Sequence, residues 1–274
     1  MIRLVGAMVL GLCLVRLSSE WALAQDASAP MTALELFQAG QTAYQRRSFE
    51  TAREHFEQFL EAYGDSEEVQ EAVKSVRPLL AICFIRTRAF EEAREAIDKV
   101  LEDPIIERSI RLELTFWKGV CQMQAADYAG SQVTFGTYYK EAPASDPRRM
   151  EAAILFGTGY VLQGQFADAI AFLGARIEES EKSAPEAAAR LMTLQLHAYL
   201  QTNQLDEAVV LTLRAADRFD QFVQIIGLQS LMLELGSRLL EDERHYDAIR
   251  CFHYVWSQER LISLQMSRQE RLEK

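Results

Sequence analysis

A regular spacing of small side chains constrains this chain more than any other feature of its sequence. Six of them are separated by 41, 38, 38, 39 and 40 residues: Ala52, Ala93, Ser131, Ala169, Ala208 and Ala248. Twelve residues before each stands another small or apolar residue: Gly40, Ala81, Gly119, Gly157, Leu196 and Gly236. A repeat of this length is typical of a solenoid, in which each unit buries its apolar face against its neighbours. The spacing therefore predicts an extended stack of units whose function is to bind another molecule, rather than a single core with a catalytic site.

Each unit is predicted to consist of two helices joined by a tight turn. We call Gly40 and its equivalents the first-helix markers, and Ala52 and its equivalents the second-helix markers. In the fourth unit we expect helices over residues 150–162 and 166–177, with Gly164 in the left-handed conformation that ends the first helix. Gly157 and Ala169 would then meet where the two helices cross. No run alternates apolar and polar residues as a strand does, so the predicted fold class is all-α.

Several residues are predicted to begin or interrupt helices. Asp103 and Asp146 each precede a proline, which is typical of a helix start. Ser183 stands three residues before a glutamate, the spacing of a capping box. Pro78 falls inside the first helix of the second unit and is expected to kink or restart that helix.

These residue types and their order resemble the tetratricopeptide repeat family. The fourth unit matches the family pattern with Gly157, Tyr160, Phe166 and Ala169, and the first unit matches it with Gly40, Phe49, Ala52 and Phe56. The resemblance covers residues 33–257 and implies a right-handed α-solenoid of about six helix-turn-helix repeats. The fifth unit departs most, because Leu196 occupies a small position, and the spacing exceeds the family's period of about 34 residues.

The N-terminus is predicted to be an export signal. Arg3 precedes an apolar run over residues 4–15, and a small-x-small sequence ends at Ala24. We expect residues 1–24 to be a signal peptide that is removed after Ala24, which implies an exported, periplasmic protein. The alternative is an uncleaved N-terminal anchor. Residues 25–32 would be a short linker, 33–257 the solenoid, and 258–274 a C-terminal helix that caps the stack, extends it or pairs with another subunit.

The composition and the missing motifs argue against several classes of function. The formal net charge of -11 disfavours a nucleic-acid partner, because binding phosphates needs clustered Lys and Arg. The four histidines lack zinc-site spacing, and the sequence contains no P-loop, G-x-S-x-G or H-E-x-x-H motif. We therefore expect no catalytic residues, no metal, no cofactor and no enzymatic activity.

Three cysteines lie beyond the predicted signal: Cys83, Cys121 and Cys251. An odd number cannot form a complete set of disulfides. Cys83 and Cys121 each follow a first-helix marker by two residues, where three other units carry Thr42, Gly159 and Ala198. Because a buried cysteine behaves as a small hydrophobic residue, we expect a packing role rather than a redox or metal role.

The family resemblance also implies a surface for a partner. Its first helices line a concave groove, and the groove positions here form an apolar stripe: Phe37, Tyr44, Ile82, Ile85, Phe116, Val120, Met123, Ile154, Val161, Leu162, Leu200, Leu233 and Leu240. Such a stripe suits an apolar peptide or an amphipathic helix. The alternative is that longer helices close the groove and bury these side chains as core. The stripe lacks the Lys, Arg and Asn that grip a C-terminal carboxylate, so no acidic-tail partner is expected.

The implied function is a protein-interaction scaffold of the cell envelope. Any association with a membrane would be through the bound partner protein. Two alternatives remain open at this stage. The chain is a structural module that self-associates, or it is the N-terminal part of a longer envelope repeat protein. The apolar residues of the C-terminal segment motivate both alternatives.

Overall fold

The computed structural model describes residues 31–218, 227–253 and 255, and these residues form helices and no strands. The helices run in the order α1 (Ala33–Gln45), α2 (Phe49–Tyr63), α3 (Gln70–Arg86), α4 (Phe90–Leu101), α5 (Arg108–Gln124), α6 (Tyr128–Glu141), α7 (Arg148–Leu162), α8 (Phe166–Ser180), α9 (Pro185–Gln201), α10 (Leu205–Arg218) and α11 (Leu228–Glu241). A short 3₁₀ turn, η1 (Glu67–Val69), precedes α3, and residues 245–253 are helical after α11. The all-α prediction is confirmed. No helix among the described residues combines the length and apolarity needed to cross a membrane.

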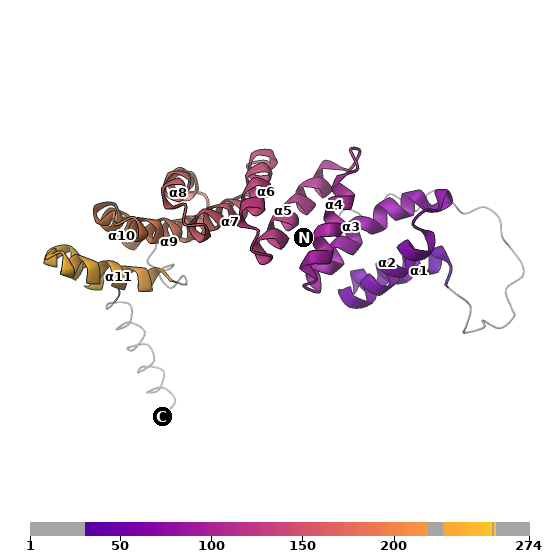
Figure 1. The fold of residues 1–274 in the computed structure, drawn as a ribbon, viewed down its shortest axis with the longest axis horizontal. Coiled ribbons are helices and arrows are strands. Elements are labelled where there is room, and N and C mark those ends of the chain that lie inside the picture. The colour runs from indigo at the N-terminus through magenta and orange to yellow at the C-terminus, as the bar shows by residue number, and fades with distance from the viewer. Residues whose placement is uncertain (1–30, 219–226, 254, 256–274) are drawn as a thin grey trace, which may run out of the picture.

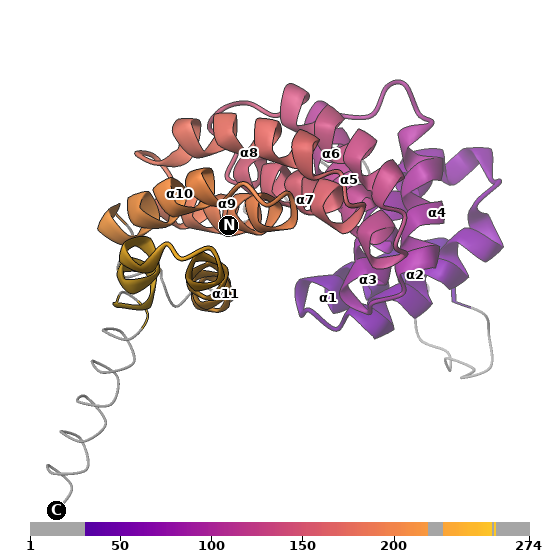
Figure 2. The ribbon, with the colours of Figure 1, turned by 60° about the vertical axis from the view of Figure 1, so that its left-hand side comes forward.

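Helices of odd number are the first helices of the units, and those of even number are the second helices. Consecutive helices pack against each other along the whole described chain, which produces a solenoid (Figure 1). Figure 2 shows that the solenoid curves into an arch, with α1 and α11 at its two ends. The first helices line the inner side of the arch, and the second helices cover its outer side. The predicted helices of the fourth unit correspond to α7 and α8.

The first-helix glycines lie at the helix crossings, but their partners differ from the prediction. Gly157 does not serve to approach Ala169; a Cβ atom added to Gly157 would lie 2.5 Å from Cδ2 of Leu173, one helical turn further along α8. Three other units repeat this approach, at 2.5, 2.8 and 2.6 Å, in the pairs Gly40–Phe56, Gly119–Phe135 and Gly236–Phe252. Each glycine therefore makes room for a large side chain, which explains why it must lack a side chain of its own. All six second-helix markers are fully buried beside these crossings.

In the second and fifth units, the two residues at the helix crossing differ in size from the glycine–large pairs of the other units. The second unit pairs Ala81 with Ile97, and both are 0% exposed. The fifth unit carries the large residue on the first helix: Leu196 is 1% exposed, and Thr212, sixteen residues later, is also 1% exposed. Because a core tolerates changes that conserve its total volume, a smaller partner at Thr212 accounts for the leucine that departs from the family pattern.

A single residue between the two helices of each unit has left-handed backbone. Gly164, with φ +69°, confirms the prediction for the fourth unit. The equivalent residues of the other units also have positive φ, between 54° and 63°: Arg47, Arg88, Ala126, Asn203 and Glu243. An L-residue in this conformation is disfavoured by about 1–2 kcal/mol relative to glycine. Four of the six turns thus contain a strained residue that tight stacking holds in place, and Asn203 is a residue type that adopts this conformation more readily.

Exchanging glycine and alanine between two of these turns is expected to change stability in opposite directions. Ala126→Gly should raise the free energy of unfolding by about 1 kcal/mol, and Gly164→Ala should lower it by about as much. Urea denaturation of the two variants measures both effects. Ala125, with φ −81°, provides the control, because Ala125→Gly gains nothing from left-handed backbone. Equal stabilisation by Ala125→Gly would contradict the explanation.

The sequence signals for helix ends are only partly correct. Asp146 Oδ1 accepts a hydrogen bond of 2.8 Å from the amide of Arg148, at the start of α7 as predicted. Asp103 instead closes a turn before α5, and the Ser183 hydroxyl donates to the carbonyl of Glu179 rather than capping α9. Both side chains are satisfied locally, so neither begins a helix. The predicted restart at Pro78 is wrong, because α3 is continuous through it.

Buried apolar residues form three clusters along the solenoid. The first extends from α1 through α5, as far as Cys121, and the third extends from α7 to residue 255. Between them lies a smaller central cluster of Leu112, Phe116, Phe135, Tyr138, Ala142 and Ala152. Trp117 packs against both the first and the central cluster. Continuity of the core therefore depends on few residues near the middle of the chain.

The three cysteines of the described chain are buried and free of disulfides, as expected for packing residues. Burial raises the pKa of Cys83 to about 12 and those of Cys121 and Cys251 to about 11. A thiol is nucleophilic only as the thiolate, so all three should be inert near neutral pH.

We expect that a protein beginning at residue 25 will take up no iodoacetamide while it is folded. In concentrated urea it should take up one adduct at each of Cys83, Cys121 and Cys251, because unfolding exposes the thiols and restores their ordinary pKa. Mass spectrometry of the intact protein and of its peptides counts the adducts. Modification of Cys83 at the same rate in both conditions would contradict the burial argument.

Candidate functional site

The inner side of the arch presents side chains in rows, each at one offset from the first-helix markers. Most predicted groove residues lie three residues before or four residues after a marker. Four of them are core residues in the structure: Ile85 and Phe116 are 6% exposed, Ile154 is 5% exposed and Leu200 is 1% exposed. The ring of Phe116, for example, packs against Phe135 at 5.8 Å between centroids. Stacking of the units therefore uses much of the predicted stripe, which leaves these four side chains inside the protein.

The remaining predicted groove residues lie closer to the surface. Six are half-buried: Phe37, Tyr44, Ile82, Val120, Met123 and Val161. Three are exposed: Leu162 at 52%, Leu233 at 43% and Leu240 at 44%. Leu233 and Leu240 have the same offsets as the buried Ile154 and Leu200 of earlier units.

A row of exposed residues lies five residues after each marker, at the last residue of each first helix. All six of its members are exposed: Gln45, Arg86, Gln124, Leu162, Gln201 and Glu241. The predicted apolar stripe includes Leu162 from this row and none of the other five residues, which are polar. Their common offset was the signal that would have revealed them. The open surface is thus a mixture of amides and charges beside half-buried Ile82, Val120 and Val161.

A cluster of arginines and aromatic rings joins three first helices on this side. The guanidinium of Arg86 lies 5.5 Å from the ring centroid of Trp117, and that of Arg148 lies 6.0 Å from it. Arg148 also forms an ion pair of 3.1 Å with Glu113. Burial raises the pKa of Tyr44 nearby, and Glu113 acts in the same direction. Cations over aromatic faces are attractive, so this cluster holds α3, α5 and α7 together.

Ion pairs continue along the edge of the inner side. Arg190 donates to both carboxylate oxygens of Glu151, at 2.6 and 3.1 Å. Glu113, Glu151 and Arg190 share one offset, six residues before their markers. A bidentate pair of this kind fixes the relative orientation of the two side chains. These charges are therefore engaged within the stack, as Arg86 is over Trp117.

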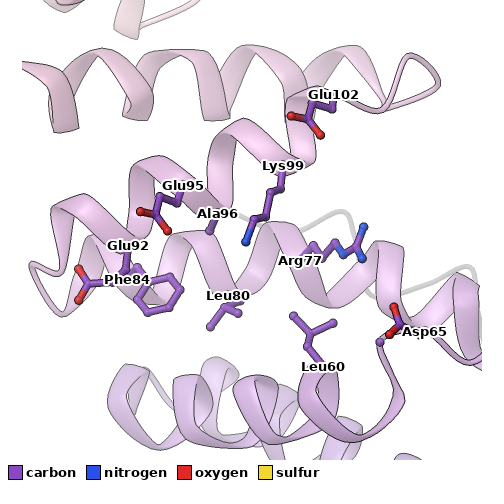
Figure 3. A pocket seen from close by; sticks show the side chains of 11 residues that line it. Leu60, Asp65, Arg77, Leu80, Phe84, Glu92, Glu95, Ala96, Lys99 and Glu102 are labelled. Carbon is purple, nitrogen blue, oxygen red and sulfur yellow. The ribbon is translucent and has the colours of Figure 1, made fainter.

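A pocket of about 510 Å³ lies on the outer side, between α2, α3 and α4 (Figure 3). Its floor is apolar: Leu60, Leu80, Phe84 and Ala96. Its rim carries six charged residues: Asp65, Arg77, Glu92, Glu95, Lys99 and Glu102. No motif marks this pocket in the sequence, because it lies between the second helices α2 and α4, outside the predicted groove.

No protein-family model and no curated protein sequence matches the chain. Among solved structures, the crystal structure of the protein MamA aligns with a TM-score of 0.54 at 14% identity, covering 71% of this chain and 95% of that one. MamA 41-end from Desulfovibrio magneticus RS-1 aligns with a TM-score of 0.51 at 19% identity, covering 68% and 95%. YrrB, a TPR protein with an unusual peptide-binding site, aligns with a TM-score of 0.52 at 13% identity, covering 69% and 87%. The likeness establishes a fold of the tetratricopeptide repeat type.

Proposed function

We propose that this chain is an exported, non-enzymatic scaffold that binds a protein or peptide of the cell envelope along the inner side of its arch. The row five residues after each marker carries the proposal, because it recurs in all six units and lies exposed beside the packed core. Gln124 and Gln201 both donate and accept hydrogen bonds, so they suit the main chain of an extended segment. Ile82, Val120 and Val161 offer apolar contact beside them.

Two further observations support this proposal. YrrB, which shares the fold, is a TPR protein with a peptide-binding site, and we infer the same class of function for this chain. Export rests on the N-terminal sequence, with Arg3, an apolar run and a small-x-small sequence ending at Ala24. The net charge of -11 favours a protein partner over a nucleic acid.

Crosslinking in intact cells tests the binding surface. A photoreactive amino acid is placed at Gln124 or Leu162 on the inner side, and at Thr137 or Ala171 on exposed positions of second helices. We expect the inner positions to yield a specific adduct that the outer positions do not. Equal adducts at all four positions, or none at Gln124 and Leu162, would refute an inner binding surface. Ile85 is unsuitable as a test position because its side chain is buried.

A separate experiment tests export. The protein purified from cells should begin at Gln25 and be released with the periplasmic contents. An intact N-terminus in the membrane fraction would instead support the uncleaved anchor, and cytoplasmic protein would contradict both.

The exposed end of α11 favours a second candidate, self-association through the last unit. Leu233 and Leu240 are exposed at the offsets where Ile154 and Leu200 are buried, so a second copy of the chain could cover them. Sedimentation velocity should then show a dimer for the wild type and a monomer for the Leu233→Ser/Leu240→Ser variant. A monomeric wild type at micromolar concentration would exclude this candidate and leave the scaffold proposal untouched.

A further inference from the structure

The outer pocket exists because the second unit carries an unusually small residue. Three residues after the second-helix markers, the six units carry His55, Ala96, Thr134, Phe172, Leu211 and Cys251. Ala96 has the smallest side chain of this series. It lines the pocket together with Leu80 and Phe84 of α3. The second unit therefore has open space at an offset where the fourth unit carries the ring of Phe172.

The fourth unit shows what fills the equivalent space. There, the ring of Phe172 packs 4.5 Å from that of Phe156 and 6.2 Å from that of Tyr160, measured between centroids. Phe156 and Tyr160 occupy the same offsets in α7 as Leu80 and Phe84 do in α3. An aromatic ring thus belongs naturally at the place that Ala96 leaves empty. A volume of about 510 Å³ is also ample for one such side chain.

The charges of the rim indicate what should accompany that ring. Arg77 and Lys99 oppose four carboxylates, and none of the six rim residues forms an ion pair within the described residues. Two carboxylates are therefore left uncompensated. Figure 3 shows Glu92 and Glu95 beside Phe84 and Ala96, Lys99 next to Glu95 and Ala96, and Arg77 and Asp65 toward the opposite end. The chain's net charge of -11 adds a long-range attraction for cations.

We propose that this pocket binds a segment of a partner protein that inserts an aromatic side chain between Leu80, Phe84 and Ala96. A lysine or arginine next to that aromatic residue would pair with Glu92 and Glu95 at the rim. The site lies on the outer side of the arch, so it is separate from the inner surface proposed above. A scaffold with both surfaces holds two segments at once, one on each side.

Three small probes that share a phenyl ring and differ in charge test this chemistry: 3-phenylpropylamine, 3-phenylpropanamide and 3-phenylpropionate. Methyl signals of Leu60, Leu80 and Ala96 in NMR titrations report occupancy of the pocket. We expect the amine to bind several-fold more tightly than the amide, and the propionate to bind most weakly. Equal affinities, a preference for the propionate, or no shift of these signals would overturn the proposal.

Variants locate the binding. Ala96→Phe fills the pocket as Phe172 does in the fourth unit and should abolish the shifts, while the circular dichroism spectrum stays unchanged. Ala171→Phe adds a ring at an exposed position of α8 and should bind the amine like the wild type. Binding retained in folded Ala96→Phe would refute the site. In the Glu92→Gln/Glu95→Gln variant, the amine and the amide should bind with equal affinity. If this variant still preferred the amine, the pairing at the rim would be refuted, and that result does not depend on whether Ala96→Phe folds.

Two blocked peptides then distinguish a protein segment from a free small cation. Acetyl-Ala-Lys-Phe-Ala-amide should shift the same methyl signals, and acetyl-Ala-Lys-Ala-Ala-amide should not. If the phenylamine binds and the first peptide does not, the pocket is not a docking site for a protein segment, and that part of the proposal is wrong.

Discussion

Gly119→Ala is expected to lower the free energy of unfolding by about 1–3 kcal/mol, the usual cost of overpacking a core. The sign is informative, because replacing glycine by alanine inside an ordinary helix raises stability by about 1 kcal/mol. Here the added Cβ atom would lie 2.8 Å from ring atoms of Phe135, which is fully buried and has no space to move. Urea denaturation followed by circular dichroism measures the change.

A rescue and a control make this test specific. The second unit already combines alanine with a smaller partner, in Ala81 and Ile97. Phe135→Ile added to Gly119→Ala should therefore recover part of the lost stability. Gly174→Ala, in α8, is the matched comparison, because its Cβ would meet one atom, Nε2 of the buried Gln195, at 3.1 Å rather than a ring at 2.8 Å. That amide donates a hydrogen bond to the carbonyl of Ile170, so we expect Gly174→Ala to gain less than an ordinary helical Gly→Ala change but to remain more stable than Gly119→Ala. If Gly119→Ala stabilised the protein as much as Gly174→Ala, the steric role of the first-helix glycines would be refuted.

The repeat register could be read from the sequence because the physical constraint recurs. Each unit needs a residue without bulk opposite a large one, so the same residue types return at nearly equal spacing. Gly164 marked its turn for a similar reason, since glycine adopts left-handed backbone freely. The other turns have the same geometry without glycine, as at Ala126. Their conformation is imposed by the packing of the flanking helices, and a local pattern gives no sign of it.

The binding surface was harder to predict, because core and groove positions are both apolar. Ile154 and Leu233 have the same offset and similar chemistry, yet Ile154 is 5% exposed and Leu233 is 43% exposed. Burial at this offset therefore depends on the neighbours in the assembled stack, which a local pattern does not reveal. The outer pocket is a similar case. An alanine such as Ala96 is common in helices and indicates no pocket by itself. Its small size becomes informative when it is compared with Phe172 at the equivalent position of the fourth unit.

Phe135→Ala is expected to cost about 3–5 kcal/mol, the range for truncating a buried phenylalanine, and to divide unfolding into two steps. Phe135 belongs to the smallest of the three clusters, at the middle of the solenoid. Because each unit is stabilised chiefly by its neighbours, weakening the middle should uncouple the two ends. Circular dichroism in urea should then show two transitions, and hydrogen exchange should assign them to the first and third clusters.

Phe56→Ala removes an equally buried ring from the first unit and serves as the comparison. Its cost should be similar, but the loss should be confined to one end, leaving a single main transition with early exchange in α1 and α2. A single cooperative transition in Phe135→Ala would show that the solenoid is coupled through contacts other than the central cluster. The cation–aromatic contacts of Arg86 and Arg148 around Trp117 would then be the connection to remove next, because they span the same boundary on the inner side.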